Sequence, residues 1–363
     1  MSTPAPAGPQ PTNWRRIAPI GMVIAAVVSL IVIAFIWPTV TSSAKHIPIA
    51  VSGPAVQVAA IEKGLDGASG DVLDPHTVDD RSAAVRDIKT RDVYGAIVLD
   101  SGTPEVLTAS AASPAVSQTL HTLATTLQQQ AQSAAAKQAT AAGTAVPTVT
   151  VKVTDVVPLS KDDANGSGLA AAAFPLVMGG MLGGIILTFL IHGTGRRLIG
   201  LAVYGIVGGL AVPAILQGWF GILQGPYLVN AAAFALSLSA IAGTILGAAA
   251  LVGRAGIAVG PVVFLLFANP LSSAATPVEF LPEPWGAVGQ WFPPGAGARL
   301  IRDISYFPDA NNTLQWLILA GWTALGIALT GLAAVLHRRR LNAHHGEHVA
   351  RPDHEHALDP LTV

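Results

Sequence analysis

Five histidines near the C-terminus form the densest group of potential metal ligands in this sequence. They lie among acidic residues in the segment "HHGEHVARPDHEH" and are His344, His345, His348, His354 and His356. Imidazoles at this density bind zinc or nickel weakly. Nothing near them in the sequence would fix a coordination geometry, however. We therefore expect residues 337–363 to form a disordered, solvated tail and to hold no metal.

A second group of potential ligands is acidic and consists of Asp79, Asp80, Asp87 and Asp92. Calcium and magnesium sites need several oxygen ligands at loop spacings, and no such pattern is present. The exposed face of a helix explains these four carboxylates better than a metal site does.

Catalytic motifs are missing from the chain. It contains no G-x-x-x-x-G-K-[ST] phosphate loop, no H-E-x-x-H, no G-x-S-x-G and no cysteine. The spaced glycines of "GTGRRLIG" lack the preceding strand that a dinucleotide site requires. We therefore expect neither enzymatic activity nor a cofactor.

Charged and aromatic residues are concentrated in a proline- and glycine-rich segment, residues 273–312. Irregular backbone is not tolerated in lipid, so this segment should lie at or beyond the membrane surface. Its aromatic rings suit the headgroup region. It is either a half-inserted cap over one end of a helix bundle or an interfacial loop that anchors the last span. Its candidate functional residues are Glu279, Glu283, Trp285, Trp291, Phe292, Arg299 and Arg302.

The composition of the chain indicates that it is a membrane protein. Of 363 residues, 11% are charged and 51% are hydrophobic, whereas soluble domains carry about 25% charged residues. No basic stripe with interleaved aromatics is present, which argues against nucleic-acid binding. Six apolar runs approach the about 20 residues that a spanning helix needs. They are Ile17–Trp37, Leu169–Ile191, Leu198–Phe220, Tyr227–Val252, Ala255–Leu271 and Thr313–Leu336.

The fifth run is the weakest, because it is short and contains Pro261 and Pro270; a break or re-entry is an alternative to a continuous span there. The first run has a rival interpretation as a secretory signal. Its 21 residues exceed the about 7–15 of a signal's apolar region, which favours an uncleaved anchor.

Arginines set the expected orientation. Clusters lie before the first run, between the second and third, between the fourth and fifth, and after the sixth. Because basic residues favour cytoplasmic loops, six spans with both termini inside place all four clusters on one side. The cytoplasmic candidates for contact with a partner ATPase are Arg196, Arg197 and Arg254.

The loop of residues 38–168 then lies outside and should fold as an α/β domain. We expect strands near Ile47–Val51, at "GDVLD", at "VYGAIVLD" and at "TVTVKVTDVVPL", with "EVLTASA" as a hairpin partner. Helices are expected near Ala55–Leu65, through "VDDRSAAVRDIKTRD", and over Pro114–Ala142. The predicted organisation is a cytoplasmic N-terminus (1–16), a first span (17–37), this domain, a five-span membrane domain (169–336) and the tail.

Three stretches resemble the membrane subunits of type-2 ABC exporters, and in particular the phage infection protein (YhgE/Pip) group. They are "PIAVSG" followed by "AAVRDIKTRDVYGAIVLD", then "DVVPLSKDDANGSGLAAAAFPLVMGGMLGG", and "LPEPWGAVGQWFPPGAGARLIRD". The resemblance implies a homodimer or heterodimer in a bacterial cell membrane that exports lipids, polymers or hydrophobic compounds with a separate ATPase. This chain departs from it in having no long amphipathic helix before the first span and only a short loop at 192–197. The alternative is a non-transporting envelope receptor or scaffold whose outer domain binds a partner.

Overall fold

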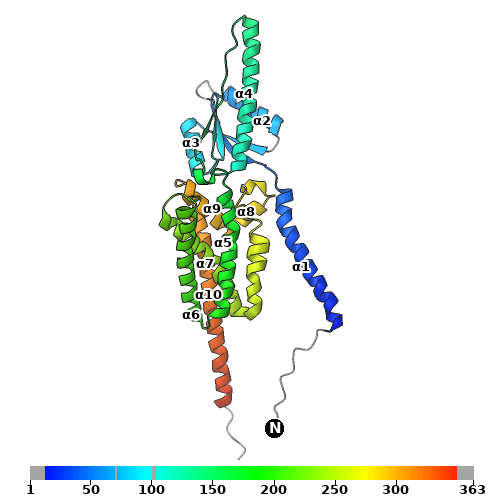
Figure 1. Ribbon diagram of the computed structural model, residues 1–363, viewed down its shortest axis with the longest axis vertical. Coiled ribbons are helices and arrows are strands. Elements are labelled where there is room, and N and C mark those ends of the chain that lie inside the picture. Colours follow the sequence, from blue (N-terminus) through cyan, green and yellow to red (C-terminus); the bar gives the residue numbers. More distant parts are fainter. Residues whose placement is uncertain (1–12, 70–71, 100–103, 350–363) are drawn as a thin grey trace, which may run out of the picture.

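The computed structural model describes residues 13–69, 72–99 and 104–349, which form an α/β domain at one end of a helix bundle (Figure 1). Five helices are long and apolar enough to cross a membrane: Arg15–Pro38, Ser167–Leu190, Thr194–Trp219, Tyr227–Ala258 and Thr313–Arg339. These five helices indicate a multi-pass helical membrane protein.

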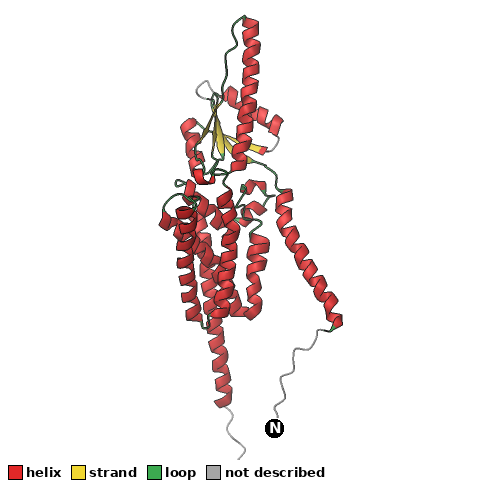
Figure 2. Ribbon diagram, in the orientation of Figure 1, coloured by secondary structure: helices red, strands yellow, loops and turns green. Residues whose placement is uncertain are grey.

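The α/β domain contains the predicted strands and helices in the predicted order. The strands are β1 (Ile47–Ser52), β2 (Leu73–Thr77), β3 (Gly95–Val98), β4 (Glu105–Thr108) and β5 (Lys152–Asp155), and the helices are α2 (Ala55–Ser69), α3 (Arg81–Thr90) and α4 (Pro114–Ala142). The sheet order is β2-β1-β3-β4-β5. Only β3 and β4 pair antiparallel, with Ala96 opposite Leu107, and this is the predicted hairpin. Figure 2 shows that all strands lie in this domain.

Every residue of β3 and β4 is buried, so both faces of these middle strands are covered. The strand β3 is accordingly a continuous apolar run. The buried residues of β4 include two polar ones, Glu105 and Thr108. The Glu105 carboxylate contacts Arg81 at 2.7 Å and Lys152 at 3.0 Å. The hydrogen bond from Arg81 lowers the pKa of Glu105 to about 2, so this carboxylate is charged at neutral pH.

Helix α4 begins and ends at the residues that its sequence predicts. The Ser113 side chain accepts a hydrogen bond from the Val116 N–H, Pro114 occupies the first turn, and Gly143 ends the helix in a left-handed conformation. The first half of the helix packs on the sheet, and the second half extends beyond it (Figure 1). There Gln132 donates to the Pro147 carbonyl (3.1 Å) and accepts from the Val149 N–H (2.8 Å), which fastens the returning chain to the helix.

The bundle is built around α7 (Tyr227–Val252), which α5 (Ser167–Leu190), α6 (Thr194–Pro213) and α10 (Thr313–Val349) surround. Two-thirds of the apolar stretch of α7 is buried (67%), against 22% for the other three helices. Small residues allow this close packing, as the sequence predicts. Gly180 and Gly184 of α5 lie against α7, and Gly205 and Gly209 of α6 lie against its other side.

Helix α1 (Trp14–Thr41) stands apart from the bundle (Figure 1), and none of its apolar stretch is buried. It approaches the rest of the molecule at its end nearest the α/β domain, where the Trp37 ring meets the edge of Trp285 at a centroid distance of 6.1 Å.

The fifth predicted span, Ala255–Leu271, is not a continuous α-helix. The chain instead forms a 3-10 helix, η4 (Gly253–Ala258), and then a π-helix, η5 (Gly260–Ala268). This segment returns along the bundle beside α5 towards the α/β domain (Figure 1). The sequence left a continuous span and a broken one as alternatives, and the structure has no continuous α-helix over this segment. Pro261 cannot donate a helical hydrogen bond, which is a local reason for the break.

Helix α10 is longer than the predicted last span and continues past Leu336 to Val349. His344, His345 and His348 therefore belong to a helical segment, which differs from the disordered tail expected there. His354 and His356 lie outside the described residues. Among the described residues no group of three or more His, Cys, Asp or Glu side chains is placed to hold a metal.

Candidate functional site

The proline- and glycine-rich segment folds into three short helices that lie between the α/β domain and the bundle. They are η6 (Val278–Phe280), α8 (Trp285–Gly289) and α9 (Pro293–Tyr306). Helix α9 packs on α5, α7, η5 and α10 at the end of the bundle (Figure 1). This packing fits the predicted cap over one end of the bundle, and insertion of the cap into a membrane stays a prediction.

Glycine allows the cap to fold this tightly. A Cβ atom at Gly289 would overlap the carbonyl oxygen of Leu271. The tight packing of α8 onto the preceding loop therefore requires a residue without a side chain at this position. Two of the prolines, Pro293 and Pro294, lie at the first turn of α9, where their missing N–H groups cost no helical hydrogen bond.

A buried ion pair joins the α/β domain to the cap. Arg91, at the end of α3, donates from its Nη1 to Asp303 on α9. The Asp303 side chain is 1% exposed and that of Arg91 is 15% exposed. The Arg91 guanidinium also lies 5.5 Å from the centroid of the Phe307 ring, and Arg299 Nε lies 3.8 Å from the second Asp303 oxygen.

Arg302 makes a second connection at the same junction. Its guanidinium donates to the carbonyl of Ala112 in the α/β domain and to that of Ala274 in the cap, each at 2.9 Å. Burial lowers the pKa of Arg302 to about 10, which leaves it protonated at neutral pH. A cation with two carbonyl acceptors therefore bridges the two parts of the molecule.

A third connection runs from Tyr94, whose hydroxyl donates to Glu279 at 2.8 Å. Burial raises the pKa of Tyr94, so the phenol remains a neutral donor.

A cavity of about 60 Å³ lies among these groups. The Ser273 Oγ and Gln290 Oε1 atoms at its wall are buried and have no hydrogen-bond partner among the described residues. A polar cavity of this size accommodates water.

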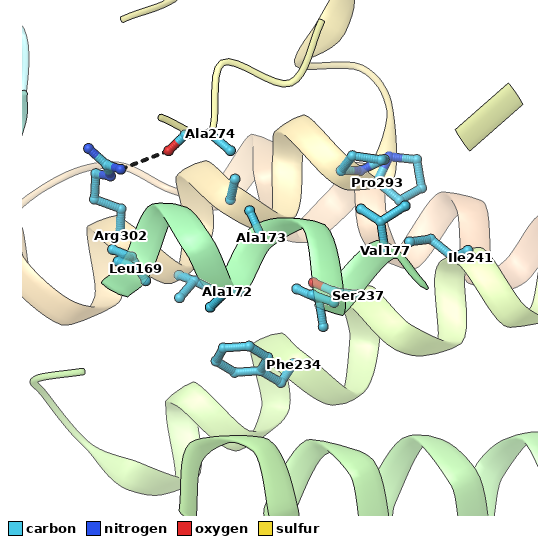
Figure 3. Close-up of a pocket in the computed structure, with 14 residues that line it drawn as sticks. Leu169, Ala172, Ala173, Val177, Phe234, Ser237, Ile241, Ala274, Pro293 and Arg302 are labelled. Carbon is cyan, nitrogen blue, oxygen red and sulfur yellow. Dashed lines mark hydrogen bonds between the residues drawn. The ribbon is translucent and has the colours of Figure 1, made fainter. Parts of the chain in front are cut away.

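Below this junction lies a small apolar pocket between α5, α7 and α9 (Figure 3). Phe234, Val177 and Ile241 contribute its apolar wall, and Arg302 lies at one end with its hydrogen bond to Ala274 directed away from the apolar wall. The pocket encloses about 20 Å³, which is room for about one water molecule. It cannot hold a larger compound unless α9 moves.

Two of the three predicted aromatic residues, Trp285 and Phe292, belong to one cluster beside the cap. The Phe267 ring of η5 contacts Trp285 at 6.1 Å and Phe292 at 5.4 Å between centroids. Phe292 in turn lies 5.7 Å from Trp322 of α10. Trp291 remains 59% exposed, and Glu283 is exposed as well. The structure therefore brings most of the predicted cap residues together, with Glu283 at the edge.

The predicted ATPase-contact arginines at the opposite end of the bundle are not equivalent. Arg197 donates to the carbonyls of Ile191 (2.8 Å) and Thr188 (3.0 Å), which are exposed acceptors at the end of α5. Its guanidinium is already used within the protein. Arg196 and Arg254 are exposed and have no side-chain partner among the described residues.

Sequence analysis missed Arg91 and Tyr94 because they lie about 200 residues from their partners. Asp303 lies in the segment that was expected at or beyond the membrane surface, yet its side chain is fully buried. A signal was present: Asp303 follows the apolar pair Leu300–Ile301 and precedes Ile304 within a strongly amphipathic helix. Comparison with family models, with curated proteins and with solved structures found no match.

Proposed function

We propose that the chain is the membrane-spanning subunit of an export-type transporter, which moves a lipid or another hydrophobic envelope compound outward and is driven by a separate ATPase. In this proposal the chain crosses a bacterial cell membrane six times, both termini are cytoplasmic, and the α/β domain is outside. The interrupted segment η4–η5 is the fifth of these six crossings. Two copies, or one copy and a related subunit, form the working unit.

The observation that carries the proposal is the interrupted helix η4–η5. Backbone with irregular hydrogen bonding is costly at membrane depth and occurs where it lines a cavity or binds a transported compound. Segments of π-helix likewise recur at functional sites. Here the π-helix η5 carries Phe264 and Phe267 of the aromatic cluster and packs against the cap helix α9. A compound that moves along η5 would reach the cap next.

A receptor or scaffold is the second candidate, and the junction favours it. The ion pair of Arg91 with Asp303, the bridge made by Arg302 and the bond from Tyr94 to Glu279 hold the α/β domain in one place. A receptor uses such a fixed domain to present a binding surface, whereas a transporter must release or bypass it to let a compound leave.

Single cysteines test the proposed orientation, because the natural chain has none. Thr119 on α4 and Gly195 at the start of α6 are both exposed, and a Cβ at Gly195 would have no atom within 4 Å. On intact cells an impermeant thiol reagent should label Thr119→Cys and should label Gly195→Cys only after permeabilisation. The reverse pattern would show that the orientation is wrong.

The ATPase is tested by purification of the full chain from native membranes in mild detergent. We expect an ATPase to co-purify, and we expect Arg196→Glu to reduce its recovery by about tenfold. An arginine–carboxylate contact contributes about 1.5–3 kcal/mol, and each 1.4 kcal/mol is a factor of ten. Arg197 is unsuitable for this purpose, since its replacement would also remove the two hydrogen bonds that cap the end of α5.

The matched control is Arg86→Glu, which reverses an exposed arginine on the α/β domain and should leave the recovery unchanged. Recovery of an ATPase with all three proteins would show that Arg196 is not a contact. Absence of any ATPase from the wild-type preparation would contradict the transporter and favour the receptor or scaffold.

A further inference from the structure

Two adjacent grooves lie on the cap side of the molecule, and charged residues line one of them but not the other. The first, called here the polar groove, encloses about 760 Å³ between the end of α1 and the cap. This lies within the range of about 300–1,000 Å³ that is typical of ligand sites. Its charged residues are Lys45, Glu279, Glu283 and Arg299, and His46 also lines it.

The second, called the apolar groove, encloses about 350 Å³ on the surface of α10. It shares Trp291 and Leu314 with the polar groove, so the two grooves are adjacent. Its remaining residues are Leu317, Ile318, Gly321, Trp322 and Leu325. The only side-chain polar atom among them, the Trp322 Nε1, already donates to the Trp291 carbonyl at 2.9 Å.

The length of the apolar groove matches one leaflet of a membrane. From Leu314 to Leu325 the helix rises by about 16 Å, at about 1.5 Å per residue. The hydrocarbon core of a bilayer is about 30 Å thick, so one leaflet is about half of this. A ligand that fills both grooves therefore has a polar group at the membrane surface and an apolar chain of one leaflet's length.

The charges of the polar groove indicate the kind of polar group. Lys45 and Arg299 are cationic, whereas Glu279 and Glu283 are anionic. Lys45, His46 and Glu283 are exposed and have no side-chain partner among the described residues. Glu279 accepts one hydrogen bond, from Tyr94, and a carboxylate has capacity for more. The lining suits a ligand with both an anionic and a cationic group better than a purely anionic one.

We propose that the two grooves bind one zwitterionic glycerophospholipid, with its phosphate near Lys45 and Arg299, its ammonium group near Glu283 and Glu279, and one acyl chain along α10. The site requires only that the apolar helices lie in a membrane. It does not require transport or an ATPase, so it can fail or succeed independently of the proposed function. An apolar helix of a second copy would leave the charges of the polar groove unpaired.

Gly321 offers a sharp test, because it lines the apolar groove and a Cβ there would have no atom within 4 Å. Gly321→Leu should therefore fill the groove without disturbing α10. Gly331 is the matched control: it lies on the same helix, a Cβ there is equally free of contacts, and it is not part of the groove.

The full chain is placed in vesicles of equal amounts of phosphatidylethanolamine and phosphatidylglycerol, extracted in mild detergent without nucleotide, and analysed by native mass spectrometry. We expect the wild type and Gly331→Leu to retain one phosphatidylethanolamine, and Gly321→Leu to retain about tenfold less, a difference of about 1.4 kcal/mol. Glu283→Lys should shift the retained lipid towards phosphatidylglycerol.

Three results would overturn the proposal. The first is equal lipid retention by the wild type and Gly321→Leu. The second is retention of phosphatidylglycerol in preference to phosphatidylethanolamine by the wild type. The third is a disulfide-linked dimer formed efficiently by Leu317→Cys within the vesicles, which would show that a second copy occupies the apolar groove.

Discussion

Replacement of Asp303 by asparagine is expected to destabilise the protein by about 3–5 kcal/mol, which is the usual cost of removing one partner of a buried ion pair. Asparagine keeps the size of the side chain but carries no charge. The Arg91 guanidinium, 15% exposed, would then remain in the junction without its counter-charge. Arg299 and Arg302 would lie beside it, and their positive charges would repel it.

Thermal unfolding in mild detergent measures this effect, and we expect the melting temperature of Asp303→Asn to fall by roughly 5–15 °C. The matched control is Asp309→Asn, an exposed carboxylate shortly after the same helix, which should melt like the wild type. The double variant Arg91→Met/Asp303→Leu should recover much of the loss, because it leaves no unpaired charge from this pair. Equal melting of Asp303→Asn and Asp309→Asn would refute this account of the junction.

The strength of the junction bears on both candidate functions. A transporter must open a path past α9, and the pocket beneath it now has room for about one water molecule. The connections made by Asp303, Arg302 and Glu279 oppose that opening. If weakening them increased export while lowering stability, the junction would be a barrier that the ATPase overcomes. A receptor would show only the loss of stability.

Local features of this fold could be predicted from the sequence because they depend on neighbouring residues. Ser113–Pro114 and Gly143 mark the ends of α4, and the buried run Gly95–Val98 is a strand between turn residues. Five of the six predicted apolar runs form long helices in the described residues for the same reason. The composition of the cap placed its aromatic rings near the membrane surface, and the structure gathers Trp285 and Phe292 around Phe267.

Contacts between distant residues could not be predicted in this way. Arg91 and Asp303 are 212 positions apart, and nothing local in either segment identifies the other as its partner. The break at η4–η5 was suggested by Pro261 but not decided by it, since neighbouring helices often stabilise a proline within a span. Arg197 shows a third limit. In the sequence, the pair Arg196–Arg197 indicates either an orientation signal or a docking site. Only the structure shows that Arg197 caps the end of α5.

The contact between α7 and α10 is expected to be as sensitive as the junction, and glycine substitutions should show it. A Cβ at Gly326 on α10 would overlap the backbone of Gly243 and Thr244 on α7. The obstacle is backbone and not a flexible side chain, so the helices themselves must separate. Separation would loosen the packing around α7, whose apolar stretch is 67% buried. We expect Gly326→Ala to cost about 1–3 kcal/mol, and a larger side chain such as valine to cost more.

Gly331→Ala provides the comparison, since it lies on the same helix and a Cβ there would have no atom within 4 Å. Alanine favours a helix over glycine by up to about 1 kcal/mol, and both substitutions gain this amount. The difference between their melting temperatures therefore reports the helix contact alone. We expect Gly331→Ala to melt at or above the wild type and Gly326→Ala clearly below it. Similar melting of the two variants would mean that α7 and α10 are not in close contact in the membrane.

A large difference between the melting temperatures of the two variants would also indicate which parts of the bundle can move. Helices whose backbones touch at Gly326, and whose side chains interlock around it, move together more easily than past one another. If the protein exports a compound, the elements that pack least on α7 would then be the ones that move. These include α1, which stands apart from the bundle, and the π-helix η5 beside it. The polar groove lies between the end of α1 and the cap, so a motion of α1 would open or close it directly.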